Sequence, residues 1–207
     1  MTLYKLRGLV ADLDSPDLRI AEHAKKTLVR IKDKRCIPLL LRQVVAISDV
    51  GLSSAVVILL GFKENDAICK YLVRMLKSRV PYYREGAAHG LMDIPQRNSF
   101  RHLLECARHE RYKAPRVWAL YALQRWYEFF GSNETAPTRE VDEILKVHAA
   151  ATRLKTISLR GAGFAGLSLI CDPRFDHYLK KASRDPRWEI REGAKTWRKH
   201  IRFRNSK

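Results

Sequence analysis

Residues 185–197 read DPRWEIREGAKTW, and related stretches recur along the chain at a nearly constant spacing. The central arginine of this stretch is Arg191, and the residues at equivalent positions, here called anchors, are Arg19, Leu52, Arg84, Arg116, Arg160 and Arg191. Successive anchors are 33, 32, 32, 44 and 31 residues apart. Repeats of this length are typical of stacked units, none of which buries its apolar face alone. The spacing therefore predicts a repeat protein, a class that usually serves as a binding surface.

Small or apolar residues follow four of the anchors, Leu52, Arg84, Arg116 and Arg160, at positions +3, +4 and +7, as Ala87, Ala88 and Leu91 follow Arg84. This spacing places them on one face of an amphipathic helix. A second apolar stripe of the same kind follows each turn, for example over residues 100–107. Each unit is therefore expected to be two helices and two short turns. We predict an all-α protein, a right-handed α-solenoid of about six two-helix repeats, forming one domain over residues 1–207.

Residues 127–138 supply the extra dozen residues between the anchors Arg116 and Arg160. Gly131, Asn133 and Pro137 predict a loop inserted into the repeats. Such a loop either carries function or is a tolerated insertion.

The charge of the chain is strongly basic, because 40 Lys and Arg face 22 Asp and Glu, a net charge of +18. This excess favours an acidic partner, such as nucleic acid, an acidic protein face or an anionic membrane surface. Residues 180–207 hold 11 basic and 3 acidic side chains, a net charge of +8. The predicted basic patch comprises Lys180, Lys181, Arg184, Arg187, Lys195, Arg198, Lys199, Arg202 and Arg204. The patch either steers a polyanion or is the solvated cap of the last repeat.

No secretory signal opens the chain, and no apolar run is long enough to span a bilayer. The four cysteines, Cys36, Cys69, Cys106 and Cys171, have no C-x-x-C or metal-ligand spacing. Cys36 and Cys69 each lie 17 residues past an anchor, which indicates a shared packing role. We therefore expect a cytoplasmic protein with no metal and no cofactor.

The pattern D-x-P-x-x-R-x-x-A-x-x-x-L is read in DSPDLRIAEHAKKTL (residues 14–28), which matches its D-x-P-x-x-R part, and in PYYREGAAHGL (residues 81–91), which matches its R-x-x-A-x-x-x-L part. It resembles the HEAT-like repeats typified by the phycobilin lyase family, over about residues 1–203. Leu52 departs from the pattern, and the fifth unit lacks the leading Asp-Pro. The resemblance implies that the repeated arginines pair with an Asp or a carbonyl of the adjacent unit. This structural ladder would consist of Arg19, Arg84, Arg116, Arg160 and Arg191; the alternative is a row of phosphate contacts.

The resemblance also implies that the anchor-bearing helices line a concave groove, into which positions +2, +5 and +9 would face. Most residues at these positions are small, but the fourth unit has Trp118, Tyr121 and Arg125 beside His89 and Asp93 of the third. Aromatic side chains flanked by arginine are typical of binding hot spots and of base-stacking surfaces. Alternatively, the two aromatics pack against each other and against the inserted loop. These five residues are the predicted partner-binding site.

We expect a non-enzymatic scaffold that holds an acidic partner protein in this groove. The alternative is a nucleic-acid-binding protein, similar to the alkylpurine DNA glycosylases built from HEAT-like repeats, in which Asp93 would be catalytic. The seven histidines have no metal-ligand spacing, and no phosphate-binding or nucleophile motif is present. An enzymatic role is therefore less expected than a binding role, and the oligomeric state stays open.

Overall fold

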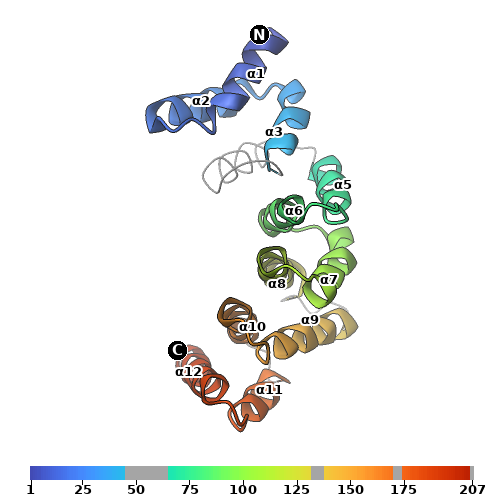
Figure 1. The fold of residues 1–207 in the computed structure, drawn as a ribbon. Helices are drawn as coiled ribbons and strands as arrows, with labels where there is room; N and C mark the ends of the chain where they lie inside the picture. The colour runs from blue at the N-terminus through green and yellow to red at the C-terminus, as the bar shows by residue number, and fades with distance from the viewer. Residues whose placement is uncertain (45–64, 132–137, 170–173, 206–207) are drawn as a thin grey trace. The chain divides into compact units, whose positions relative to one another are not determined.

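Helices account for almost all of the described chain (Figure 1). The computed structural model describes residues 1–44, 65–131, 138–169 and 174–205, and no strand occurs among these. The chain divides into two compact units, residues 1–99 and 100–207, and each is described by itself. The prediction of one domain over residues 1–207 stays a prediction, and the anchor Leu52 lies outside the described residues.

The first unit consists of helices joined by short turns. In order these are α1 (Leu3–Asp12), α2 (Leu18–Ile31), the 3₁₀ turn η1 (Lys34–Cys36), α3 (Ile37–Val44), α5 (Asn65–Met75), α6 (Pro81–Asp93) and the 3₁₀ turn η2 (Arg97–Ser99). Helix α1 packs against α2, and α5 packs against α6, so the predicted helical hairpins form. Their cores contain fully buried leucines such as Leu6, Leu28, Leu72 and Leu91.

The second unit contains three consecutive hairpins. Its elements are α7 (Phe100–His109), α8 (Lys113–Trp126), the π-helix η3 (Tyr127–Gly131), α9 (Thr138–Ala151), α10 (Ile157–Leu169), α11 (Arg174–Ala182) and α12 (Trp188–Asn205). Helix α10 packs against both α8 and α12, so the anchor-bearing helices of this unit form one layer, while α7 packs against α9 in the other (Figure 1). The predicted all-α hairpin repeat is therefore confirmed.

The predicted core stripes are buried in both units. The residues at +3, +4 and +7 from Arg116, namely Ala119, Leu120 and Leu123, are all inaccessible to solvent. The prediction for positions +2, +5 and +9 is partly wrong, because Ala24, Leu28 and Ala162 are also buried. These positions carry small or apolar side chains because neighbouring helices lie against them.

Helices α9 and α10 approach closely at two glycines. A methyl group on Gly163 would lie 2.8 Å from the carbonyl oxygen of His148 and 2.8 Å from the backbone nitrogen of Thr152. A methyl group on Gly166 would overlap the His148 ring. That ring is fully buried, and burial lowers its pKa. Its Nδ1 lies 2.9 Å from the Ile144 carbonyl oxygen, and its Nε2 lies 3.2 Å from the Leu120 carbonyl oxygen. His148 is thus a packed core residue.

The start of the expected insertion is helical. Residues 127–131 continue α8 as a π-helix rather than a loop, and residues 132–137 lie outside the described residues. An aromatic cluster holds this segment, since the Trp126 ring lies 4.8 Å from that of Phe100 and 5.2 Å from that of Phe130. The aromatic residues in YEFFG favour ring packing, as Phe130 on Trp126 shows, over an unstructured loop, which the Gly and Pro signals alone do not reveal.

Four of the five predicted ladder arginines donate to main-chain carbonyls near the turn before their own helix. The donor–acceptor pairs are Arg84 Nη1 and Ser78 O at 2.7 Å, Arg116 Nε and Ala107 O at 2.8 Å, Arg160 Nη1 and Lys155 O at 2.8 Å, and Arg191 Nη1 and Pro186 O at 2.6 Å. Cations here also interact favourably with the C-terminal end of the preceding helix. Arg19 differs, because its side chain is 92% exposed and lies 3.6 Å from Asp17.

Two other arginines join successive hairpins. Arg35 Nη2 donates to the Met1 carbonyl oxygen at 2.9 Å, and Arg187 Nη1 donates to the Arg153 carbonyl oxygen at 2.6 Å. In each case the acceptor lies 34 residues earlier, about one repeat. Asp33 orients the first guanidinium and Asp185 the second, each by accepting the Nε proton at 3.0 Å. We call each Asp-x-Arg pair with its carbonyl acceptor a clip.

The cysteines of the described residues are buried free thiols, and Cys171 lies outside them. Burial raises the pKa of Cys36 and of Cys69 to about 11, so both stay protonated at neutral pH. Cys36 Sγ donates to the Asp33 carbonyl oxygen at 2.7 Å, and Cys69 Sγ donates to Asn98 Oδ1 at 3.1 Å. Both thiols thus have packing roles, as their equivalent positions predict, although Cys36 bonds within its own turn and Cys69 bonds to a residue 29 positions later.

Candidate functional site

A basic pocket of about 640 Å³ lies in the second unit, between the α9–α10 turn and the α11–α12 turn. It is lined by Arg153, His177, Lys180, Lys181, Arg184, Asp185 and Pro186. All five of its basic side chains are exposed. We call this set the basic pocket.

The repeat architecture positions this pocket. Arg153 stands in the turn that precedes α10, and its own carbonyl oxygen accepts the hydrogen bond from Arg187. This clip holds the two turns side by side. The pocket's sole carboxylate, Asp185, is already engaged, since it accepts from Arg187 N and Nε, both at 3.0 Å. Those bonds hold the pKa of Asp185 below its usual value, so it stays ionised and bound to Arg187.

Two large apolar side chains are exposed at the first positions of α10 and α12, the helices that follow these two turns. Ile157, the first residue of α10, is 78% exposed, and Trp188, the first residue of α12, is 64% exposed. Exposed tryptophan beside arginine is the composition of a protein-binding hot spot. We call the basic pocket together with Ile157 and Trp188 the basic edge.

The members of the predicted basic patch differ in whether they have acidic partners and in where they lie. Several members have acidic partners: Lys180 and Arg198 contact Asp176 at 2.6 and 3.1 Å, Lys195 contacts Glu192 at 2.7 Å, and Arg187 forms the clip. Lys181 and Arg184 make no ion pair with any of the described residues, and both line the pocket. Lys199 lines a separate shallow depression on α12. The side chains of Arg202 and Arg204 lie outside the described residues.

Sequence reasoning missed Arg153, His177, Ile157 and Trp188. A usable signal existed for two of them, because Ile157 and Trp188 each stand three residues before an anchor, where no core stripe accounts for them. Arg153 joins the pocket because the clip brings the two turns together, and His177 joins it from α11, four residues before Lys181.

The predicted aromatic hot spot forms a pair on α8. The rings of Trp118 and Tyr121 pack edge to face with centroids 6.0 Å apart, and both residues are half-buried. Arg125 turns toward the π-helix instead, where its Nη1 contacts Glu128 at 2.6 Å and its guanidinium lies 5.1 Å from the Phe129 ring centre. The pair presents part of its aromatic surface to solvent, while Arg125 is satisfied locally.

His89 and Asp93 lie on α6, in the first unit, whereas Trp118, Tyr121 and Arg125 lie in the second. Both are half-buried and interact with other residues. The five residues of the predicted partner-binding site are therefore described as two separate groups. The catalytic role of Asp93 stays a prediction.

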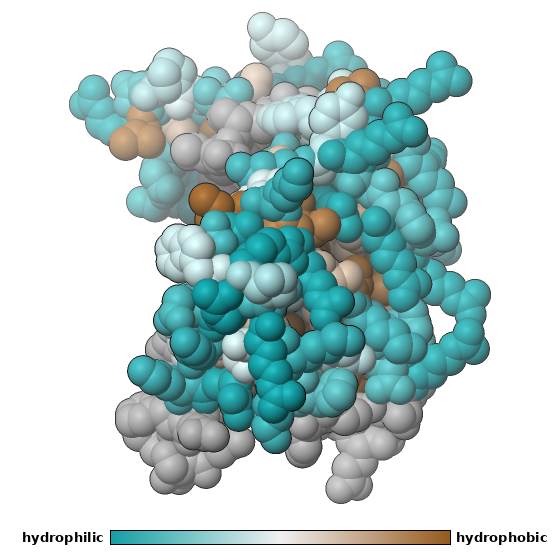
Figure 2. Space-filling model, turned by 60° about the horizontal axis from the view of Figure 1, so that its bottom comes forward, coloured by the Kyte–Doolittle hydropathy of each residue, from teal (hydrophilic) through white to brown (hydrophobic). Residues whose placement is uncertain are grey.

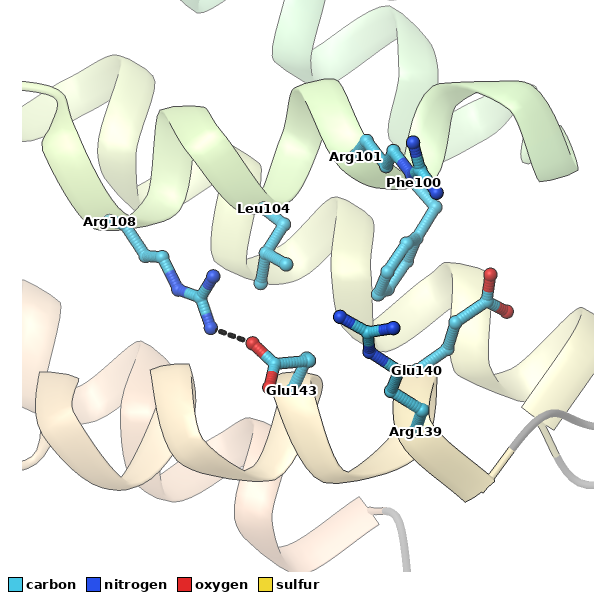
Figure 3. A pocket seen from close by; sticks show the side chains of 7 residues that line it. All are labelled: Phe100, Arg101, Leu104, Arg108, Arg139, Glu140 and Glu143. Atoms are coloured by element: carbon cyan, nitrogen blue, oxygen red, sulfur yellow. Dashed lines mark hydrogen bonds and ion pairs between the residues drawn. The ribbon is translucent and has the colours of Figure 1, made fainter.

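A second pocket, of about 460 Å³, lies between α7 and α9 (Figure 3). Phe100 and Leu104 point into it, and an ion pair between Arg108 and Glu143 closes one side. This bond holds the pKa of Glu143 below its usual value. Three arginines and two glutamates line this pocket, so its charge is far closer to balance than that of the basic pocket.

The surface drawn in Figure 2 is largely hydrophilic, with hydrophobic residues in small separate areas. None of the helices in the described ranges is long and apolar enough to cross a membrane. Nor do the described residues contain a group of three or more His, Cys, Asp or Glu side chains able to hold a metal ion.

No protein-family model matches the sequence, and no curated protein is significantly similar to it. Solved structures are similar in fold. The structure of Kap95p with RanGDP matches 95% of this chain and 33% of its own at a TM-score of 0.67 and 14% identity. An engineered protein matches 98% of this chain and 97% of its own chain, at a TM-score of 0.55 and 14% identity. A designed armadillo repeat protein in complex with a (KR)4 peptide matches 95% of this chain and 99% of its own, at a TM-score of 0.51 and 11% identity.

These likenesses establish the fold and nothing finer. In fold the chain is an α-solenoid of HEAT-like two-helix repeats, which confirms the architecture read from its repeated motif.

Proposed function

We propose that this protein is a non-enzymatic binding scaffold whose partner is an acidic protein. The observation that carries the proposal is the basic edge, which combines cations that lack a described carboxylate partner with exposed Ile157 and Trp188. Apolar anchors supply burial at such a surface, while cations steer the partner and set its orientation.

The sign of the charge supports this choice of partner. The designed armadillo repeat protein is in complex with a strongly basic peptide, (KR)4. The present chain has a related fold and a net charge of +18. Complementarity therefore favours a ligand of the opposite sign.

A protein fits the basic edge better than a nucleic acid does. Carboxylates interrupt the cations of α11 and α12, since Asp176 and Glu192 each bind neighbouring lysines. A nucleic-acid groove follows the phosphate backbone with continuous positive charge. Mixed charges around an exposed tryptophan are typical of the rim and core of a protein interface. The Trp118–Tyr121 pair on α8 would extend the same contact.

Affinity capture from native lysate tests the proposal, with and without nuclease, using the wild-type chain and Trp188→Ser. The matched control is Leu18→Ser, because Leu18 is the first residue of α2 and is 70% exposed. We expect wild type and control to retain a discrete acidic protein after nuclease treatment, and Trp188→Ser to lose about tenfold of it. Capture that vanishes with nuclease would favour the nucleic-acid alternative, and equal capture by all three chains would contradict the assigned surface.

A further inference from the structure

The basic pocket holds more positive charge than its local partners neutralise. Lys180 is paired with Asp176, and Asp185 is paired with Arg187. Arg153, His177, Lys181 and Arg184 form no ion pair with a carboxylate of the described residues, and the charge of Arg153 reaches Asp185 only at longer range. Within the described chain, the pocket therefore contains four basic side chains around one space with no anion assigned to them.

These side chains converge from two hairpins. His177 and Lys181 stand four residues apart on α11 and share one face of that helix, and Arg184 follows in the turn after it. Arg153 comes from the preceding hairpin, and the clip fixes its backbone carbonyl against the guanidinium of Arg187. Its charge also reaches Asp185, whose pKa it helps to lower.

Ordinary helix electrostatics account for only part of this arrangement. Cations are favoured at the C-terminal end of a helix, and Lys181 and Arg184 lie at that end of α11. That explanation does not cover Arg153, which belongs to a different hairpin, or His177, which lies in the first half of α11. The positive charges of Arg153, Lys181 and Arg184 around one space also repel one another. An anion bound between them would relieve this repulsion.

We infer that the basic pocket binds a phosphoryl group, carried as a phosphorylated residue on the acidic partner. This inference rests on the proposed function and deepens it. A phosphate monoester carries about −1.5 to −2 charges and three acceptor oxygens, so it engages several cations at once. A single carboxylate offers one charge and two oxygens. The planar donor forks of Arg153 and Arg184 match phosphate oxygens in pairs.

The placement of the apolar residues supports a peptide as the carrier. Ile157 and Trp188 begin the helices that follow the two turns flanking the pocket. A partner segment with a phosphorylated residue in the pocket would thus have apolar contacts beside it. Free phosphate would engage the cations alone, so it should bind more weakly than a phosphorylated peptide.

Fluorescence anisotropy with three labelled acidic peptides tests the inference on the full chain. The peptides share one sequence of Asp, Glu and Leu and differ at a central residue, which is phosphoserine, glutamate or serine. We expect the phosphoserine peptide to bind about tenfold more tightly than the glutamate peptide, the lower range for gaining a charge-assisted hydrogen bond. Inorganic phosphate in excess should compete with the phosphoserine peptide.

Matched variants assign the effect to the pocket. Arg153→Gln and Arg184→Gln should each remove most of the phosphoserine preference. Lys199→Gln, the control, removes one charge from a residue of α12 that does not line the pocket, so it should keep the preference. These side chains are exposed, so the variants are expected to fold.

The outcomes separate this inference from the proposed function. Equal affinity for the phosphoserine and glutamate peptides would overturn the phosphoryl site and leave an acidic partner standing. Tighter binding of a labelled RNA of equal charge would overturn both. Loss of the preference in Lys199→Gln to the same extent as in Arg184→Gln would mean a diffuse charge effect and would also overturn the site.

Discussion

Two glycines of α10 that lie two residues apart should respond oppositely to alanine. Gly161 is exposed, and an added methyl group would meet no atom within 4 Å. Gly161→Ala should therefore stabilise the protein by about 0.5–1 kcal/mol, because alanine loses less backbone entropy than glycine in a helix.

Gly163→Ala gains the same helix propensity but meets the backbone of α9. The new methyl group would lie 2.8 Å from both the His148 oxygen and the Thr152 nitrogen, which bond to each other at 3.1 Å. Backbone within a helix cannot move aside as a flexible side chain does, so α9 must shift as a whole. Overpacking of this kind costs about 1–3 kcal/mol. After the propensity gain, we expect a net destabilisation of about 0.5–2 kcal/mol.

Urea unfolding followed by far-UV circular dichroism and by tryptophan fluorescence measures both variants. Both changes lie on one helix of the second unit, so the comparison between them does not depend on the first unit. In thermal unfolding, the midpoint temperatures of the two variants should also differ, by about 2–4 °C for each kcal/mol in a chain of this size. If Gly163→Ala proved as stable as Gly161→Ala, the close approach of α9 and α10 would be wrong.

Three further predictions concern single side chains. Burial lowers the pKa of His148 from 6.5, so the unfolded chain takes up a proton that the folded chain resists. The free energy of unfolding should therefore fall as the pH drops below about 6.5. The difference in unfolding free energy between about pH 7.5 and 5.5 should be smaller in His148→Gln than in the wild type. Arg187→Ala should raise the pKa of Asp185 toward 3.8, because the hydrogen bond from Arg187 is the largest cause of the lowered pKa. An NMR titration of the carboxyl group measures this change, and an equal pKa of Asp185 in variant and wild type would contradict the clip. Trp126→Ala should cost about 3–5 kcal/mol in urea unfolding because the side chain is 1% exposed, whereas half-buried Trp118→Ala should cost less than half as much.

The periodic features of the fold could be predicted because they repeat. Anchors about 32 residues apart and stripes at +3, +4 and +7 locate the hairpins, and Ala119, Leu120 and Leu123 are buried as expected. Positions +2, +5 and +9 were harder to place. A small residue there fits either a groove or a close helix contact, and only the packing of α8, α10 and α12 distinguishes them.

The candidate site depended on contacts that periodicity does not contain. The basic patch could be located from composition, but Arg187 turned out to bind Asp185 and a carbonyl 34 residues earlier. The same bond brings Arg153 to Lys181 and Arg184, which no local pattern in the sequence indicates. The π-helix at residues 127–131 was missed for a related reason, since Phe130 packs on Trp126, whose ring is in turn placed by Phe100 of a different helix.

The Arg187 clip does not depend on the side chain at position 153. The acceptor is a main-chain oxygen, so any amino acid at position 153 can supply it, and the side chain there takes no part in holding the hairpins together. Position 153 is thus free to change sign or size during evolution without loosening the junction. A related chain could therefore carry a different side chain at this turn and keep the same hydrogen bond between its hairpins.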